Sequence, residues 1–243
     1  LVNRCARLLL ALFVVGCSLD PKPARLHVVN LVERAPSVRV RICAEAGEDD
    51  CRETEVAHGS IGAWMSLSPG AHRFQLSTAE GNLTDFRFGL GRDGVYALVL
   101  YGIAEPPVRT SWRSRAKQLL GGIDQPLVAG YQVGHRMVRM QSPGSDTPAR
   151  LRLANMSPGA TKIAADLDLG VEHRTLSPVP YGSLGESVDA GRNRGTLAVS
   201  FADSPLTLVS RKLALPPGSI TVVYVGAFDR TVPLLVVDQW SGQ

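Results

Sequence analysis

One short stretch of the chain holds a serine and a histidine that could act as a nucleophile and its base. Ser60 lies two residues after His58 and twelve before His72, and an imidazole beside a hydroxyl is the usual means of activating serine for acyl transfer. The pattern Gly-Ser-Ile-Gly at 59–62 lacks the strand–Gly-x-Ser-x-Gly–helix context of a nucleophile elbow. It recurs as Gly-Ser-Leu-Gly at 182–185, where Tyr181 replaces the histidine. We therefore expect a shared turn built on its glycines.

The sequence contains no motif typical of a metal or cofactor site. The histidines are not arranged as His-Glu-x-x-His, and the cysteines form no Cys-x-x-Cys pair, so no metal site is predicted. Asp166 and Asp168 alternate along a predicted strand, and we expect a solvated pair of carboxylates. Glycine-rich phosphate loops are absent. The sequence predicts no catalytic residue and no cofactor.

The first sixteen residues have the form of an export signal. Arg4 and Arg7 precede the uncharged run Leu8–Gly16, which is far shorter than the roughly 20 residues of a membrane span but fits a secretory h-region. Val14-Val15-Gly16-Cys17 resembles the bacterial lipobox, in which the cysteine is lipidated and the signal is cut in front of it. We expect residues 1–16 to be removed and Cys17 to carry a lipid anchor. An ordinary signal with an incidental cysteine is the alternative.

The residue after the cysteine bears on the destination of the protein. An aspartate there would resemble an inner-membrane retention signal of Gram-negative lipoproteins, and this chain has Ser18. We expect a lipid-anchored protein of the bacterial cell envelope, in the outer membrane and facing the periplasm or the surface.

Two cysteines remain for a disulfide once Cys5 leaves with the signal and Cys17 is lipidated. Export takes Cys43 and Cys51 to a compartment where disulfides persist. Cys43 ends a predicted strand and Cys51 follows the loop 44–50. A hairpin return could bring their Cα atoms within the roughly 4.4–6.8 Å that a bridge requires. We predict a Cys43–Cys51 disulfide, with two free thiols as the alternative.

The chain contains an internal repeat. Segments matching at nearly constant offsets of 123–125 residues are Pro23–Asn30 with Pro148–Asn155, His58–Gly62 with Tyr181–Gly185, and Val95–Gly102 with Ile220–Gly226. Constant offsets along a whole unit indicate two copies of one domain. We expect a tether over 17–23, a first repeat over 24–142, a linker over 143–148 and a second repeat over 149–243.

Within each repeat the hydrophobic period is two. Val38, Val40 and Ile42 alternate with Arg39 and Arg41, which is typical of a half-buried strand. Short Val- and Leu-rich runs are separated by turn signals such as Ser-Pro-Gly at 68–70 and Pro-Pro-Gly at 216–218. Such spacing predicts an all-β protein of two tandem antiparallel β-sandwiches.

The second repeat resembles a known family in three segments: "ARLRLANMSPGA" at 149–160, "VPYGSLGESVDAG" at 179–191 and "ITVVYVG" at 220–226. These are similar to the bacterial "domain of unknown function 4397" repeats of exported and surface proteins. The first repeat keeps "ARLHVVN" at 24–30 and "VYALVLYG" at 95–102, but departs after Gly102. The resemblance covers most of residues 24–243. It implies an Ig-like or transthyretin-like sandwich and no activity.

The departure after Gly102 is an insertion of about twenty residues, at about 104–130, into a predicted hairpin. Thr110 is a plausible N-cap, and the apolar spacing predicts a short amphipathic helix over Ser111–Leu120. If its apolar residues pack on the sandwich, three cations face outward. The predicted partner surface consists of Trp112, Arg113, Arg115 and Lys117. Its partners would be an envelope protein, an anionic polymer, anionic headgroups or the acidic hairpin Glu45–Glu55; the alternative is a solvated helix face.

The overall charge does not favour nucleic acid as a partner. Loss of Arg4 and Arg7 with the signal lowers the formal net charge from +4 to +2. Binding to a phosphate backbone requires basic residues clustered on one face, which only the insert offers. We expect a membrane-anchored envelope lipoprotein with a non-enzymatic binding or structural role. The alternatives are an envelope hydrolase using Ser60 or a carboxylate pair, and a scaffold subunit of an envelope assembly.

Overall fold

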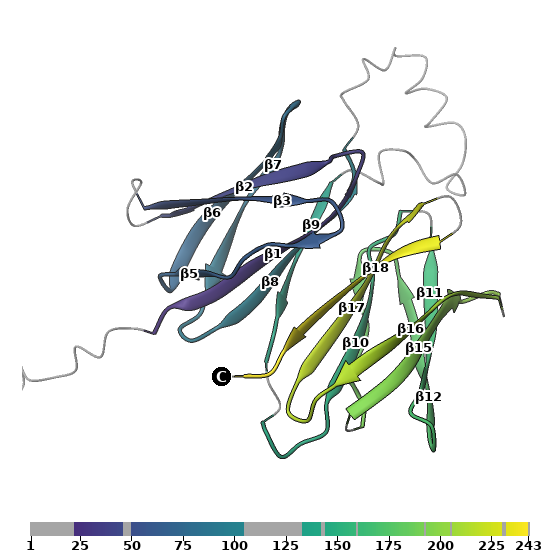
Figure 1. The fold of residues 1–243 in the computed structure, drawn as a ribbon. Helices are drawn as coiled ribbons and strands as arrows, with labels where there is room; N and C mark the ends of the chain where they lie inside the picture. The colour runs from purple at the N-terminus through teal and green to yellow at the C-terminus, as the bar shows by residue number, and fades with distance from the viewer. Residues whose placement is uncertain are drawn as a thin grey trace, which may run out of the picture.

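Two β-sandwiches in tandem make up the described part of the chain in this computed structural model (Figure 1). The structure describes residues 22–45, 50–104, 133–141, 144–158, 160–191, 193–204, 206–229 and 232–242. These ranges contain strands and turns but no helix, and hence no helix able to cross a membrane. Outside the described residues lie the expected signal 1–16, Cys17, the helix Ser111–Leu120 and its side chains Trp112, Arg113, Arg115 and Lys117.

Each sandwich consists of an inner and an outer sheet. In the first repeat, the inner sheet contains β4 (Ser60–Ile61), β5 (Met65–Leu67), β1 (Ala24–Glu33), β8 (Val95–Ile103) and β9 (Gly134–Arg139). Its outer sheet has the order β3 (Cys51–Ala57), β2 (Ser37–Ala44), β6 (Gly70–Thr78) and β7 (Gly81–Leu90).

The second repeat has the same strand order. Its inner sheet contains β13 (Ser183–Leu184), β14 (Val188–Asp189), β10 (Arg150–Asn155), β17 (Ile220–Asp229) and β18 (Val232–Trp240). Its outer sheet has the order β12 (His173–Pro180), β11 (Lys162–Asp168), β15 (Asn193–Phe201) and β16 (Thr207–Leu215). The structure therefore confirms the prediction of two tandem all-β sandwiches.

The sheets are not purely antiparallel, which corrects the sequence-based prediction. β1 pairs parallel to β8 and antiparallel to β4 and β5, and β10 pairs parallel to β17 in the same way. Between the two parallel strands the chain crosses to the outer sheet and returns, so no tight turn has to join them.

The shared Gly-Ser-aliphatic-Gly pattern is a turn in both repeats. The N–H of Gly59 donates to the carbonyl of Asn30 at 2.8 Å, and that of Gly182 donates to Asn155 at 2.7 Å. Both glycines have a positive φ, 71° and 68°, which a residue with a Cβ adopts only with strain. This confirms the prediction of a shared turn.

Three apolar cores hold the sheets together. One lies between the two sheets of the first sandwich and includes Phe74 and Leu98, and a second fills the second sandwich around Leu167 and Val223. β2 alternates buried and exposed positions as predicted. The third core joins the inner sheets of the two sandwiches, so the four sheets stack in the order outer, inner, inner, outer.

The third core corrects the prediction that all strands are half-buried. Every residue from Leu26 to Val32 on β1 is buried. The inner strands carry apolar side chains on both faces of their sheet. A sheet with two apolar faces must be covered on both. The residues of the third core are Val29, Leu31, Ala97, Val99, Val138 and Met140 from the first sandwich, and Ala154, Met156, Ile220, Val222, Tyr224 and Val236 from the second.

Corresponding ends of the two sandwiches lie side by side. We call the end where β1 begins, beside Lys22, the entry end; β18 ends near it (Figure 1). The guanidinium of Arg25 there lies 4.7 Å from the centroid of the Trp240 ring. At the opposite or far end, Gly59 packs against Leu234. The N–H of Ala104 bonds there to Glu33, the last residue of β1, and β9 begins there. Strands of nine or ten residues separate the two ends by about 30 Å.

Candidate functional site

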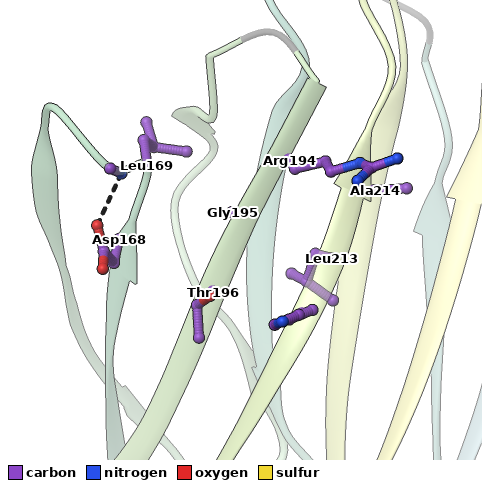
Figure 2. Close-up of a pocket in the computed structure, with 9 residues that line it drawn as sticks. Asp168, Leu169, Arg194, Gly195, Thr196, Leu213 and Ala214 are labelled. Carbon is purple, nitrogen blue, oxygen red and sulfur yellow. Dashed lines mark hydrogen bonds between the residues drawn. The ribbon is translucent and has the colours of Figure 1, made fainter.

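A hollow of about 520 Å³ opens on the second outer sheet, near its entry end (Figure 2). Three neighbouring strands, β11, β15 and β16, position its walls. Their register places Asp168 beside Thr196, and Thr196 beside Lys212. Arg194 completes the polar lining used below, and Leu169 and Leu213 lie behind it, where their side chains pack in the core of the second sandwich.

The hollow combines groups of different polarity. The carboxylate of Asp168 accepts a hydrogen bond of 2.7 Å from the N–H of Gly170, drawn as a dashed line in Figure 2. Arg194 and Lys212 are exposed and bring two cations to the rim, while Leu213 is buried beneath them. The exposed side chains at the hollow are therefore mainly charged and polar groups that can bind a polar ligand.

The equivalent place on the first outer sheet carries different side chains. One row of cross-strand neighbours on the second outer sheet consists of His173, Asp168, Thr196 and Lys212. The corresponding row on the first outer sheet consists of Cys51, Cys43, Arg73 and Arg87. Ion pairs hold the two arginines over the sheet: Arg73 with Asp85 at 2.7 Å and Arg87 with Glu45 at 2.9 Å. Aligning the two repeats strand by strand would have revealed this difference from the sequence.

The predicted disulfide is present. Cys43 and Cys51 face each other across β2 and β3, and a disulfide joins them, with their Cα atoms 4.1 Å apart. It closes the hairpin at the entry end of the first outer sheet.

In the described part of the acidic hairpin Glu45–Glu55, three carboxylates pair with arginines of their own sheet. Arg39 on β2 lies 3.2 Å from Glu53 and 3.7 Å from Glu55, and Glu45 pairs with Arg87. These carboxylates therefore have cationic neighbours without the insert, whose flanking residue Ala104 lies at the far end of the sandwich.

The residues considered for catalysis have separate neighbours. Ser60 is exposed on β4, and the Nδ1 atom of His58 lies 2.9 Å from the carbonyl oxygen of Val32. His72 lies on the other sheet with its Nδ1 atom 3.1 Å from the carbonyl oxygen of Gly70. The structure does not bring the serine and the histidines together.

Of the other candidate ligands and acids, His173 meets Asp168 at 3.6 Å, and the rest have other neighbours. Asp166 accepts a hydrogen bond from the hydroxyl of Thr175 at 2.6 Å, whereas Asp168 faces the hollow. His135 stacks on Phe86 at 3.6 Å between ring centroids. Within the described ranges, no group of three or more His, Cys, Asp or Glu side chains could hold a metal ion.

Sequence reasoning missed a buried polar pair between the two sandwiches. The Nε2 atom of His27 on β1 lies 2.8 Å from the carboxylate of Asp238 on β18, with 1% and 4% of the two side chains exposed. The hydroxyl of Tyr224 lies 3.4 Å from the same carboxylate. Burial raises the pKa of Tyr224 well above its usual value, and the adjacent Asp238 raises it further. The alternating pattern of β1 places His27 on the face predicted to be exposed, so no sequence signal indicates this pairing.

An aromatic cluster adjoins this pair at the entry end. Arg25 lies over two indole rings, 5.3 Å from the centroid of Trp64 and 4.7 Å from that of Trp240. The two indole centroids are 5.1 Å apart, and Trp64 also meets the ring of His27 at 4.0 Å. We call Arg25, Trp64 and Trp240, all partly exposed, the aromatic patch.

Comparisons with known proteins place the chain in no family. No family model and no curated protein matches it. A "putative cell adhesion protein" from Bacteroides ovatus is similar at 12% identity and a TM-score of 0.26, over 92% of this chain and 99% of that one. A CBM26-family structure from Eubacterium rectale in complex with maltoheptaose reaches 9% identity and 0.25, over 90% and 97% of the two chains. Another "putative cell adhesion protein", from Bacteroides eggerthii, reaches 10% and 0.23, over 94% and 98%. Scores this low carry no argument about this chain.

Proposed function

We propose that this chain is a lipid-anchored protein of the bacterial outer membrane that binds an acidic, hydroxyl-rich polymer in the hollow and catalyses no reaction. The anchor rests on the lipobox-like residues Val14–Cys17, and the envelope location agrees with the resemblance to the domain of unknown function 4397 repeats. The hollow is the single observation that carries the binding role.

The side chains at the hollow match the groups of such a polymer. Arg194 and Lys212 donate to carboxylates or phosphates, and Asp168 and Thr196 accept from hydroxyl groups. The hollow lies on an exposed sheet face, so a long chain can lie across it.

Small side chains continue from the hollow along the outer face. The next row of the sheet pairs Asp166 with Ala198, and Ala198 with Ser210. Such short side chains let a polymer approach the sheet closely. The first outer sheet instead carries paired arginines and carboxylates, which a ligand would have to displace or desolvate.

A substitution that fills the hollow tests the proposal. Thr196→Phe places a ring among Asp168, Arg194 and Lys212, and Ser200→Phe is the matched control on the same strand and face. Affinity electrophoresis in gels containing alginate or dextran measures retardation by an acidic and a neutral polysaccharide. We expect alginate to retard the wild type and the control, and the binding of Thr196→Phe to be about tenfold weaker, or about 1.4 kcal/mol. Equal retardation of all three proteins would refute binding at the hollow.

We also propose a second contact, with an envelope protein, through the insert residues Trp112, Arg113, Arg115 and Lys117. The position of the flanking residue Ala104 at the far end supports this choice, because that end lies about 30 Å from the point where the anchored chain enters. Binding residues also tend to lie on loops carried by a rigid scaffold.

A further inference from the structure

We propose that the aromatic patch of Arg25, Trp64 and Trp240 rests on the phospholipid headgroups of the membrane that holds the protein. The proposal depends on the lipid anchor at Cys17 given under the proposed function. It assigns a membrane-contact surface to the entry end of both sandwiches.

The length of the chain before β1 limits how far the entry end can lie from the bilayer. Lys22 is five residues from Cys17, and an extended chain spans at most about 3.6 Å per residue. The tether can therefore reach no more than about 18 Å, which is shorter than either sandwich. A lipid at Cys17 would keep the entry end close to the headgroups in every orientation that the tether allows.

The aromatic patch lies at this end. Arg25 is the second residue of β1, and Trp240 is the last residue of β18. Trp64 lies between β4 and β5, and Met65, the next residue, pairs with Leu26. All three patch side chains are partly exposed, so the third core does not cover them completely.

The chemistry of the patch suits the headgroup region. Indole rings have an apolar body and an N–H donor, and tryptophan is enriched where membranes meet water. A guanidinium binds phosphate through two parallel hydrogen bonds. Arg92, which is exposed, adds a cation at the same end of the first sandwich, where Lys22 pairs with Asp93 at 3.5 Å.

A second observation points to the same surface. Val171, in the turn between β11 and β12, is 101% exposed. This turn follows Asp168 at the entry end of the second outer sheet, so an uncovered apolar side chain lies at the corresponding end of the second sandwich.

Fluorescence quenching in the lipid-modified, full-length protein tests the proposal. Trp112→Phe leaves Trp64 and Trp240 as the only tryptophans of the three. The protein is reconstituted into phosphatidylethanolamine–phosphatidylglycerol vesicles, with or without lipids brominated near the top of the acyl chains. We expect weaker emission in the brominated vesicles, and weaker quenching after Val171→Asp.

A reporter at the far end provides the control. Leu206 is 68% exposed in the turn between β15 and β16, and a bimane label on Leu206→Cys, in a protein that keeps Arg25, Trp64 and Trp240, should emit equally in both kinds of vesicle. Equal emission of Trp64 and Trp240 in both kinds of vesicle would overturn the membrane contact and leave the patch as a clamp between the sandwiches. Mass spectrometry separates the two proposals: a protein without acyl groups on Cys17 contradicts the anchor, whereas an acylated protein without quenching contradicts only the contact.

Discussion

Asn30 and Asn155 occupy the same place in the two sandwiches and make the same two kinds of hydrogen bond. The side-chain N–H of Asn30 donates to the carbonyl of Val56 at 2.9 Å, and its oxygen accepts from the N–H of Val32 at 3.0 Å. Asn155 donates to Val179 at 3.1 Å and accepts from Ser157 at 3.2 Å. Each amide is fully buried and ties an inner sheet to its outer sheet.

Truncating either asparagine should destabilise the protein. Asn30→Ala leaves the carbonyl of Val56 and the N–H of Val32 buried without a side-chain partner, and we expect a loss of about 2 kcal/mol of unfolding free energy. Asn155→Ala should cost more, because its N–H group also donates to Ala160 at 2.9 Å. Urea unfolding measures both losses, with the exposed Asn82→Ala as the control. A loss no larger than that of the control would contradict this role.

The repeated asparagine shows why the repeat could be predicted from the sequence. Asn30 and Asn155 end matching segments because the same backbone groups must be satisfied in each sandwich. The glycines of the shared turn recur for a similar reason, since both need a positive φ. The disulfide also follows from local sequence, because its cysteines are only eight positions apart.

The buried pair between the sandwiches leads to a second prediction. His27→Leu leaves the carboxylate of Asp238 buried beside Tyr224, and loss of one partner of such a pair costs about 3 kcal/mol. The double variant His27→Leu/Asp238→Leu should lose clearly less than the sum of the two single variants, because two apolar groups can replace a buried polar pair.

A double-mutant cycle in urea measures this coupling. The control is His173→Leu, whose ring lies 3.6 Å from Asp168 on the exposed face, and which should change stability by less than about 0.5 kcal/mol. Additive losses in the cycle would show that His27 and Asp238 act independently.

The third core could not be predicted from one strand at a time. Arg25 and His27 alternate with Leu26 and Val28, which indicates one solvent-exposed and one buried face, yet His27 is buried. Its neighbours on the same face, Ala97 and Val99, lie on a strand some seventy residues away. Only the assembled sheet shows that the second face is apolar as well. The hollow likewise depends on residues from three strands.

The disulfide should contribute measurable stability. Its loop spans eight residues, for which the loop-entropy relation gives about 2.5 kcal/mol. Cys43→Ser/Cys51→Ser should lose stability of this order in thermal or urea unfolding. Mature wild type purified without reductant should show no thiol from either cysteine, and two free thiols would refute the bridge.

Removal of the expected lipid site should release the protein from the membrane. Several acyl chains, at about 0.8 kcal/mol per buried CH₂, give stable attachment, whereas one chain binds only marginally. Cys17→Ala should appear in the soluble fraction or persist as precursor, while Cys5→Ala should behave as the wild type. A mature Cys17→Ala protein that stays in the membrane fraction would rule out lipidation at this residue.

Charge reversal tests the partner surface on the insert. Substituting glutamate at Arg113, Arg115 and Lys117 should lower salt-dependent retention of the protein on envelope fractions without changing its melting temperature. Retention of the anchored protein on pure anionic vesicles should change little, because Ala104 places the start of the insert at the far end. Each cation near an anionic membrane is worth about 1 kcal/mol. A selective loss on vesicles would therefore favour headgroups as the partner, and unchanged retention on both at low salt would eliminate the surface.

The parallel pairing of β1 with β8 has a mechanical consequence. A lipid at Cys17 would transmit any pull on the membrane through Lys22 into β1, along the direction of the strand. β1 is paired with β8 over nine residues and with β4 and β5 on its other edge, so this load shears the evenly spaced hydrogen bonds of the parallel pair together instead of opening them one at a time. We expect the strand nearest the anchor to bear tension between the membrane and whatever the protein holds, and the first sandwich to resist extraction of its own N-terminus.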